Sequence, residues 1–431
     1  MRVLIISPHF PPVNAPDMQR VRMLLPYFSD NRVEAEILAV EPEQVACVRD
    51  EWLMDGLPPE VPVHRVRVLG LAWAKFPGLG TLGFRAMRAL CKRGDELLAS
   101  KRFDLVYFST TVFEIHVLGP RWKRKLGVPF VMDYQDPWVN NYYREHPKVR
   151  PPGGRLKYWV IDRVHRLMER EVLSECAGVT TVSLAYLIQL RERYPAFATT
   201  PFLVQPFPGD TADLRRAASK GSEGEVFDSG DGCLHWVYAG VVIPGMHGTL
   251  RAFFRALKQA LDGGWEPNLR IHFIGTNYSV NALPVIGPIA AEFGLSGLIE
   301  ELPWRIPYSQ VLACLSSADA LLVFGSDDPG YTASKIYPYI LARKPLLTIF
   351  HHDSSVVTVM GEVGGGICVA FSNDDSEELV AERIGKTWFE GKLWEHLVAL
   401  NEAAFAPYTA PVAVAKLVAF FQNCIGRSDV K

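Results

Sequence analysis

Short apolar runs alternate with longer segments of helical periodicity along this chain, and this alternation constrains its fold more than any other feature. Val3–Ile6 is typical of a strand buried on both faces, because it is uninterrupted and ends in turn residues. Similar runs follow at 104–109, 129–132 and 179–182. Helical patterns separate them, at about 84–99, 113–125 and 155–175. The order strand, helix, strand predicts a parallel sheet.

A second series of the same kind occupies the later part of the chain. Its apolar runs lie at 234–239, 269–275, 320–324 and 345–350. Between the two series, 217–232 is polar and rich in Gly, Ser and acidic residues, which predicts a surface loop near a domain junction. A length of 431 residues suits two or three domains. We therefore expect an α/β fold of two doubly wound, Rossmann-like domains facing a cleft, with boundaries at 1–210 and 211–385.

Composition and motif content exclude several classes of protein. Lys and Arg number 45 against 47 Asp and Glu, so no basic field favours nucleic acid. The seven cysteines are scattered without a C-x-x-C pair, as expected of reduced thiols. The chain lacks G-x-S-x-G, H-E-x-x-H, Walker A and G-x-G-x-x-G sequences. Adjacent His351 and His352 should point to opposite faces of an extended segment. We expect neither a metal nor a bound cofactor.

The sequence shows no strong targeting signal. Met1–Ser7 holds too short an apolar run for a signal peptide, and no segment has the roughly 20 apolar residues of a spanning helix. We expect a cytoplasmic protein, with contact at the inner face of the membrane left open. The apolar segment 69–84 suits either a lipid-acceptor flap or a packed loop. Two basic clusters suit solvated helix faces better than an anionic lipid surface. They are Arg121, Lys123, Arg124 and Lys125, and Arg85, Arg88, Lys92 and Arg93.

Loops that follow the predicted strands are the places to search for a site, because open parallel sheets bind ligands at the carboxyl ends of their strands. Pro8–Arg20 follows the first strand and leads into a helix expected near Asp17, whose free amides could bind an anion. Candidate contacts in this loop are Asn14, Gln19 and Arg20. The alternative makes Asp17 a helix-start acid and Arg20 a surface residue.

The loop 325–335 is the strongest candidate for binding a diphosphate. It follows an apolar strand and opens a helix, so that helix amides capped by Ser or Thr and the Lys335 ammonium would meet phosphate oxygens. The other candidate contacts in this loop are Gly330, Tyr331, Thr332 and Ser334. The alternative is a capped helix with a surface lysine. Pro338 fits only a first turn, so the helix should begin at Ser334 or be kinked.

Further polar candidates follow other predicted strands. Asp133 and Asp136 end the third strand, where two carboxylates suit hydroxyl recognition or proton handling. They could also cap a loop beside a core Trp138. The candidates in the second series are Gly240, His247, Thr276, Trp304 and Arg305. Trp304 or Arg305 could stack on a nucleobase, although a core role for the tryptophan fits as well. His247 suits contact with phosphate and a plain helix start equally.

Together these segments resemble a GT-B glycosyltransferase, and most of all the large retaining family 4. The opening VLIISPHFPP, the DLVYFS strand, the DYQDPW segment and the SKIYPYILARKPLL segment occur in the family's order. The resemblance implies that the second domain holds a nucleoside diphosphate sugar and the first holds an acceptor. It also implies retention of anomeric configuration, and closing helices, 386–431, that return to the first domain.

The sequence departs from the family pattern mainly on the donor side, although Lys335 is retained. The residues that stand in place of the usual ones are Ala15 and Pro16 for a glycine pair, Val241 for an arginine, Met246 or His247 for a lysine, and Gly330 and Pro338 for two glutamates. The resemblance therefore implies the fold directly, whereas the donor site differs in its charges.

From the residues and the resemblance we expect a metal-independent glycosyltransferase. It would move a sugar from a nucleoside diphosphate sugar to a glycan, lipid-linked or small-molecule acceptor, as in polysaccharide biosynthesis. Lys335 and Arg20 would stabilise the departing diphosphate, and Asp136 would orient the acceptor hydroxyl. The missing glutamates and cations leave open a noncatalytic subunit that binds a sugar nucleotide or a partner enzyme. A sugar-nucleotide 2-epimerase of the same fold is a further alternative.

Overall fold

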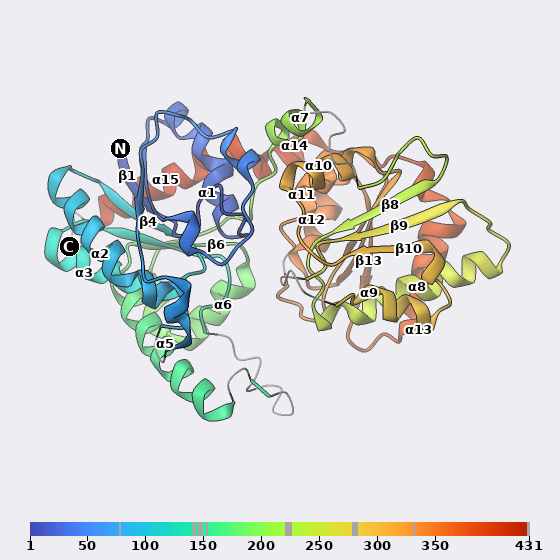
Figure 1. The fold of residues 1–431 in the computed structure, drawn as a ribbon, viewed down its shortest axis with the longest axis horizontal. Coiled ribbons are helices and arrows are strands. Elements are labelled where there is room, and N and C mark those ends of the chain that lie inside the picture. The colour runs from blue at the N-terminus through green and yellow to red at the C-terminus, as the bar shows by residue number, and fades with distance from the viewer. Residues whose placement is uncertain are drawn as a thin grey trace. The chain divides into compact units, whose positions relative to one another are not determined.

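The chain forms two compact units in a computed structural model (Figure 1). The first unit comprises Met1–Phe207 together with Ala410–Lys431, and the second comprises Pro208–Thr409. The observed boundary thus lies close to the one expected at 210. The structure describes all residues except 77–78, 140–143, 145–149, 152–153, 220–225, 278–282, 332 and 429–431.

The first unit is built on a parallel sheet. Its described strands are β1 (Arg2–Ile6), β2 (Glu34–Val40), β3 (Val63–Val66), β4 (Leu105–Ser109), β5 (Phe130–Tyr134), β6 (Gly178–Thr181) and β7 (Phe202–Val204). They lie in the order β3-β2-β1-β4-β5-β6-β7, with Val3 beside Ala35 on one side and Leu105 on the other. All the pairings are parallel, which confirms the prediction from the alternating apolar and helical segments.

Helices cover both faces of this sheet and form a separate core on each. They are α1 (Met18–Leu24), α2 (Leu82–Ser100), α3 (Leu118–Leu126), α5 (Arg155–Glu175), α6 (Leu184–Arg193) and α15 (Ala410–Ser428). On one face α2, α3, α5 and α6 pack against strand residues such as Leu4 and Phe108. On the other, α1 and α15 pack against the intervening residues, such as Val3 and Tyr107. Successive strand residues point to opposite faces, so continuous apolar runs were needed to supply both cores.

The second unit repeats this architecture. Its described strands are β8 (Leu234–Ala239), β9 (Leu269–Ile274), β10 (Ile299–Leu302), β11 (Ala320–Phe324), β12 (Leu346–His351) and β13 (Ile367–Phe371). They form a parallel sheet in the order β10-β9-β8-β11-β12-β13. In each sheet the strand order reverses once, between β1 and β4 in the first unit and between β8 and β11 in the second. Both units are therefore doubly wound, as predicted.

Helices of the second unit also flank its sheet. The described helices are α7 (Thr211–Ser219), α8 (His247–Asp262), α9 (Ile286–Glu292), α10 (Tyr308–Ser317), α11 (Ile336–Leu341), α12 (Ser355–Val363), α13 (Glu377–Ile384) and α14 (Glu402–Phe405). The core between the sheet and α8, α9 and α13 centres on the fully buried Trp236. Because α7 extends to Ser219, the expected surface loop at 217–232 is helical at its start. Residues 220–225 of that loop lie outside the described residues.

The chain returns to the first unit later than expected. Residues 386–409 remain with the second unit, and the return begins at Ala410, not after 386. Trp388 and Trp394 explain the difference, because both are buried with ring centroids 5.8 and 5.9 Å from that of Trp236. Burying two indoles in an existing aromatic core holds this segment to the second unit.

The returning helix α15 packs closely on β6, and Gly178 makes this approach possible. A Cβ at Gly178 would lie 2.5 Å from Cys424 Sγ and 2.7 Å from Phe420 Cζ. We predict that Gly178→Ala destabilises the first unit by about 1–3 kcal/mol, because both helix side chains are buried and must shift. Urea unfolding of the full chain measures this effect. Gly70→Ala is the matched control, since nothing lies within 4 Å of its Cβ position. Equal stability of the two variants would contradict the packing described.

Candidate functional site

The predicted site residues of the second unit follow strands that end at the same edge of its sheet. The loop 240–246 follows β8 and the loop 325–335 follows β11, and these two strands are neighbours where the strand order reverses. At such a point the two connections depart to opposite faces of the sheet, so the strand ends leave room for a ligand. The topology therefore brings together the loops that the sequence singled out.

Lys335 is the central feature of this edge. Its ammonium donates a hydrogen bond to the Tyr238 hydroxyl over 2.8 Å and lies 4.4 Å from the centre of the Tyr238 ring. Among the described residues no carboxylate forms an ion pair with it. Burial lowers the pKa of Lys335 from 10.5 to about 7. A half-buried ammonium that has no ion-pair partner among the described residues is suited to receive an anion from a ligand.

Gly240 makes the space that Lys335 occupies. Its φ of +147° and the absence of a side chain matter here, because a Cβ would overlap the Lys335 ammonium. The neighbouring Ala239 is fixed by Tyr339, whose hydroxyl accepts from Ala239 N at 2.6 Å and donates to Ala239 O at 3.1 Å. Tyr339 belongs to α11, the helix that Lys335 precedes. The lysine is thus held between the end of β8 and the start of α11.

Two further contacts join the loops of β8 and β11. Thr249 Oγ1 of α8 donates to the Gly325 carbonyl at 2.9 Å, and Asp327 N donates to the Gly245 carbonyl at 3.0 Å. The helix α8 begins at His247, directly after the first of these loops, with no side-chain cap and no acid in its first turn. Its partial positive charge therefore favours an anion at this end. His247 is half-buried there, as its candidacy for phosphate contact requires.

The loop before α11 differs in one respect from expectation. The helix begins at Ile336, with Lys335 at its start, and no side chain caps it. Ser334 is therefore not the expected cap. Pro338 lies within the first turn, as predicted. Gly330 lies in a turn in which its N–H donates to Asp328 Oδ1 at 2.8 Å.

The remaining candidate residues of the second unit differ in their burial and in the partners of their side chains. Tyr331 stacks on Phe350 with ring centroids 6.4 Å apart, and Thr332 lies outside the described residues. Thr276 is fully buried and donates to Glu301 at 2.6 Å, so its hydroxyl has a structural partner. Trp304, after β10, is 47% exposed. This exposure excludes a core role for Trp304, and Arg305 beside it is half-buried.

In the first unit the equivalent reversal point holds a histidine and an aspartate. His9 Nδ1 lies 2.9 Å from both carboxylate oxygens of Asp17. Asp17 also accepts from Thr110 Oγ1 at 2.7 Å and from Thr111 N at 3.1 Å. Burial opposes ionisation of Asp17, but the His9 charge and these hydrogen bonds outweigh it and lower its pKa. Asp17 in turn raises the pKa of His9 against the effect of burial.

This pair changes the interpretation of the first loop. Asp17 immediately precedes α1 and places a carboxylate at the helix end where an anion was expected, so an anionic ligand would be repelled. Asp17 does not cap α1 either, because its side chain is directed to the His9 ring and to the β4 loop. With Nδ1 held by Asp17, Nε2 is the ring nitrogen left to exchange a proton. Sequence reasoning missed His9, although its position directly after the first strand was a usable signal.

Arg20 and Asp133 do not lie where a ligand could reach them, which corrects their expected roles. Their side chains are 1% and 0% exposed, and Arg20 Nε lies 2.8 Å from Asp133 Oδ2. Arg20 also donates to the Gln205 carbonyl at 2.8 Å, and Asp133 accepts from Ser109 and Thr180. The two charges neutralise each other inside the first unit, as a buried pair must. They hold β5 to the segment that follows β7.

Asn14 and Gln19, the other residues of the first loop that were expected to contact a ligand, form hydrogen bonds within the first unit. Asn14 is buried, and its N–H donates to the Val48 carbonyl at 2.8 Å. Gln19 is half-buried and accepts from Arg22 Nε at 2.6 Å. Trp138 is buried beside Phe113, with ring centroids 5.7 Å apart, so its core role is confirmed.

Asp136 is the predicted acid that remains accessible in the first unit. Its side chain reaches solvent, yet the surrounding protein raises the pKa of its carboxyl to about 6, first by limiting hydration and second through the charge of Asp17. A carboxyl with a pKa near neutrality can hold or release a proton under ordinary conditions. Asp136, Asp17 and His9 therefore form a titratable group at the carboxyl edge of this sheet.

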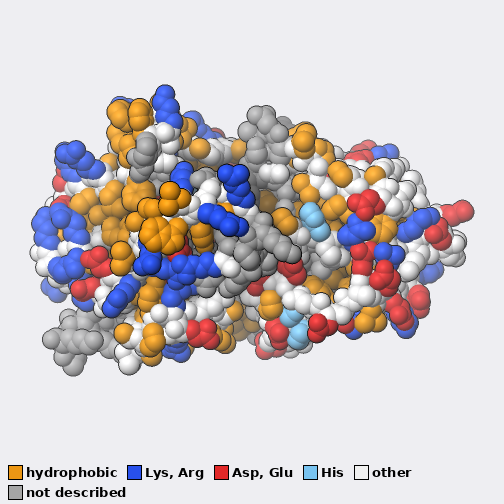
Figure 2. All heavy atoms as spheres, turned by 90° about the horizontal axis from the view of Figure 1, so that it is seen from below, with side chains coloured by type: hydrophobic (Ala, Val, Ile, Leu, Met, Phe, Trp, Pro, Cys, Tyr) orange, Lys and Arg blue, Asp and Glu red, His pale blue; other side chains and the backbone are white. Residues whose placement is uncertain are grey.

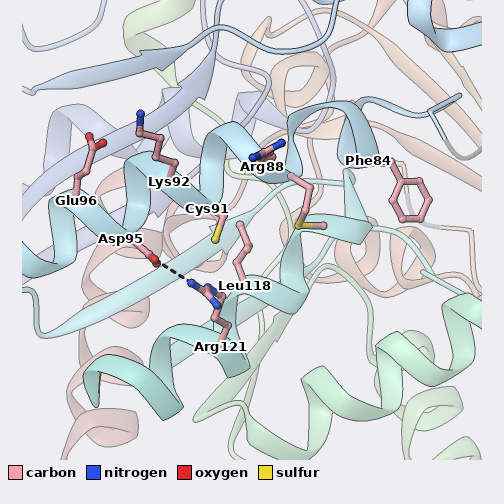
Figure 3. A pocket seen from close by; sticks show the side chains of 9 residues that line it. Phe84, Arg88, Cys91, Lys92, Asp95, Glu96, Leu118 and Arg121 are labelled. Carbon is pink, nitrogen blue, oxygen red and sulfur yellow. Dashed lines mark hydrogen bonds and ion pairs between the residues drawn. The ribbon is translucent and has the colours of Figure 1, made fainter.

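The basic cluster expected on α3 is used in ion pairs between helices. Figure 3 shows a hollow between α2 and α3 in which Arg121 reaches Asp95. Arg121 and Lys125 lie 3.0 and 2.7 Å from Asp95, and Arg124 lies 3.0 Å from Glu171. This favours the interpretation as solvated helix faces. The hollow contains none of the predicted site residues.

The histidine pair at the end of β12 departs from expectation. The rings of His351 and His352 stack with centroids 4.5 Å apart and do not point to opposite faces. With Asp353 they form a group whose ligand atoms lie within 4.8 Å of one another. His351 Nδ1 already accepts from Asp353 N at 3.2 Å, so this nitrogen is occupied within the tripeptide. The geometry alone does not make this group a metal site.

Comparison with solved structures identifies the fold. Matching structures include the Anabaena protein HepE in complex with UDP and glucose, at 11% identity and a TM-score of 0.61, covering 98% of this chain and 99% of that chain. A UDP-forming α,α-trehalose-phosphate synthase from Burkholderia xenovorans matches at 13% identity and 0.62, covering 98% of each chain. A UDP-N-acetylglucosamine 2-epimerase, so described, from Listeria monocytogenes matches at 11% and 0.53, covering 99% and 97%. The fold is GT-B.

The sequence comparison adds a family for part of the chain. Residues 19–202, nearly the whole first segment of the first unit, match the family described as glycosyl transferase 4-like domain. Together with the fold, this match confirms the resemblance to GT-B glycosyltransferases of family 4. No curated protein matches the chain in sequence. None of the described helices combines the length and apolarity needed to cross a bilayer.

The uncompensated charge of Lys335 leads to a prediction about stability. Its folded pKa is lowered, so wild-type stability falls as pH decreases from about 10.5 towards 7. We predict that Lys335→Met is more stable than wild type near pH 7, by on the order of 2 kcal/mol, and that the difference shrinks at about pH 9.5. Urea unfolding of the full chain at both pH values measures it. If Lys335→Met were less stable than the wild type at pH 7, the Lys335 ammonium would have a stabilising partner in the folded protein.

Proposed function

We propose that this protein transfers a sugar from a nucleoside diphosphate sugar to a hydroxyl acceptor. The observation that carries the proposal is the Lys335 ammonium, which is half-buried at the reversal point of the second sheet and has no ion-pair partner among the described residues. The fold and the family match of residues 19–202 support the same class of reaction. A diphosphate would supply the missing negative charge, which explains why the chain retains a lysine that costs it stability.

Lys335 would act when the bond between sugar and diphosphate breaks. Negative charge then develops on the leaving phosphate, and an ammonium already placed and poorly hydrated stabilises it without reorganisation. The start of α8, with its partial positive charge and the His247 side chain, would meet the other phosphate group. No metal is needed in this arrangement because these groups supply the positive charge.

Trp304 would receive the base of the nucleotide. Its exposed face lies after β10, in the same series of strand ends as Lys335 and His247. The complex of HepE with UDP-glucose makes UDP the first nucleotide to test. Stacking on an aromatic face is tolerant of the base, so the choice among nucleotides rests on other contacts.

The first unit would bind the acceptor. Asp136 is accessible and, when ionised, would accept a hydrogen bond from the acceptor hydroxyl. We propose retention of anomeric configuration, in which the leaving phosphate takes the proton of that hydroxyl on the same face. His9, held by Asp17, offers an alternative base. Proton removal by such a base on the opposite face would give inversion, which the anomeric configuration of the product distinguishes.

Nucleotide binding is the first prediction of this proposal. UDP, GDP, dTDP, CDP and ADP would be compared by thermal shift, with and without Mg²⁺. We expect one of them to stabilise the wild type, by roughly 2.7 kcal/mol at 100 times its dissociation constant, and not to stabilise Lys335→Met. Lys386→Ala is the control, because Lys386 is an exposed lysine of the same unit paired with Glu382. If the nucleotide stabilised Lys335→Met as much as the wild type, Lys335 would not belong to the nucleotide site.

Turnover separates the proposed reaction from its alternatives. The assay would use an acceptor and sugar donors that carry the nucleotide identified by thermal shift. We expect Lys335→Met to lower kcat by about 10²-fold or more. An acceptor-independent change of the donor sugar would instead identify a 2-epimerase. Binding without any release of nucleoside diphosphate would identify a noncatalytic subunit, an alternative favoured by the replacement of two family glutamates by Gly330 and Pro338.

The pKa of Asp136 predicts the acid limb of the pH profile. Because its pKa is about 6, the carboxylate forms above that pH and is lost below it. We expect kcat/KM to fall below about pH 6, and Asp136→Asn to lower activity throughout and to lack this limb. Initial rates from about pH 5 to 8 would measure both profiles. An unchanged acid limb in Asp136→Asn would assign it to another group, such as His9.

A further inference from the structure

The helix α5 presents apolar side chains to solvent along its first half. Leu156, Trp159 and Leu167 are 78%, 53% and 68% exposed, and Val160 and Val164 are exposed between them. Residues 156, 160, 164 and 167 recur at the spacing of one helix face. That face is the outer one, because the opposite side of α5 carries the buried Asp162 and Glu169. Its polarity is the reverse of that of an ordinary surface helix.

Cations lie along the same outer face. Lys157, Arg163 and Arg170 are exposed, and among the described residues none of the three forms an ion pair. The Arg163 guanidinium instead lies 5.3 Å from the centre of the Trp159 ring. The cations of α3 differ, since they are neutralised by acids of α2 and α5. Uncompensated positive charge is therefore associated with the exposed apolar residues.

A second apolar projection belongs to the segment before α2. Leu71, Trp73 and Phe76 are each nearly half exposed, with the Trp73 and Phe76 rings 5.3 Å apart. Lys75 lies 5.9 Å from the centre of the Phe76 ring. Arg85 fixes the start of this segment by donating to the Leu69 carbonyl at 2.7 Å. The segment is therefore held against α2, but its large side chains are not packed.

Both projections belong to the first unit. Glu114 links the elements next to them, because it packs against Gly83 at the start of α2 and lies 3.9 Å from His165, on the side of α5 that carries Asp162 and Glu169. Figure 2 views the molecule from the side on which α5 projects in Figure 1, and it shows apolar side chains gathered on the first unit with Lys and Arg beside them. The exposed apolar residues and cations of α5 are hereafter called the α5 face.

We propose that the α5 face binds the surface of an anionic lipid membrane. Exposed Leu and Val would enter the boundary between head groups and acyl chains, Trp159 would lie at the head-group level, and Lys157, Arg163 and Arg170 would meet anionic head groups. The unpaired cations of α5 are complementary in charge to anionic head groups, which favours a membrane over a second copy of the chain. A second copy of the chain in a two-fold contact would place the same unpaired cations against one another, which is unfavourable.

The experiment is co-sedimentation of the full chain with vesicles. Vesicles of equal parts phosphatidylglycerol and phosphatidylcholine are compared with vesicles of phosphatidylcholine alone. We expect the wild type to sediment with the anionic vesicles and much less with the neutral ones, and added salt to weaken binding. Two triple variants test the two components: Leu156→Gln, Val160→Gln and Leu167→Gln for the apolar face, and Lys157→Gln, Arg163→Gln and Arg170→Gln for the charge.

Each triple variant should lower the partition coefficient on anionic vesicles by roughly tenfold or more. The matched control changes three exposed leucines of the second unit, Leu283→Gln, Leu379→Gln and Leu397→Gln, and should bind as the wild type does. All the altered side chains are exposed, so the folded state should be unaffected, which thermal unfolding verifies. Nucleotide binding, a property of the second unit, should be unchanged.

Three results would overturn the proposal. The first is that the wild type does not sediment with anionic vesicles. The second is that both α5 variants bind as well as the wild type. The third is a concentration-dependent dimer in sedimentation velocity that the apolar variant abolishes, without any vesicle binding. That last result would assign the α5 face to contact between copies of this chain.

Discussion

The reversal of strand order in each parallel sheet is the constraint on which the candidate sites depend. Strands end at one edge of a parallel sheet, and where the order reverses the two connections leave to opposite faces. In the second unit this places Lys335 beside Gly240 and Tyr238. In the first unit it places His9 and Asp17 beside the loop that follows β4. One topological rule therefore gives the chain two polar centres.

The two centres use buried charge in opposite ways. In the first unit Arg20 and Asp133 compensate each other, so the pair joins β5 to the segment after β7 and leaves no charge for a ligand. In the second unit the Lys335 ammonium contacts the Tyr238 hydroxyl and ring and has no ion-pair partner among the residues that the structure describes, and its pKa falls to about 7. A compensated pair holds a structure together, whereas an uncompensated ammonium favours the binding of an anion. This difference separates the structural residues from the candidate functional ones.

Local sequence predicted the elements well but not the partners of their side chains. The helix at Arg155–Glu175 and four strands in each sheet follow from apolar periodicity, which depends on near neighbours alone, whereas edge strands such as β3 and β10 were not predicted. The ion pair of Arg20 with Asp133 joins residues more than 100 positions apart, so both remained candidates for ligand contact until the fold was known. The return at Ala410 was missed for the same reason, because Trp388 and Trp394 are held by Trp236.

By itself the sequence determined that this chain forms two doubly wound units with polar loops at the carboxyl ends of their strands. Apolar runs and helical periods carry that information locally, and the resemblance to family 4 follows from contiguous motifs. Only the tertiary structure decided which charges are paired: Arg20 and Asp133 pair with each other, whereas Lys335 has no ion-pair partner among the described residues. It also decided that one face of α5 remains uncovered. Burial and charge compensation depend on residues distant in sequence, and no local pattern records them.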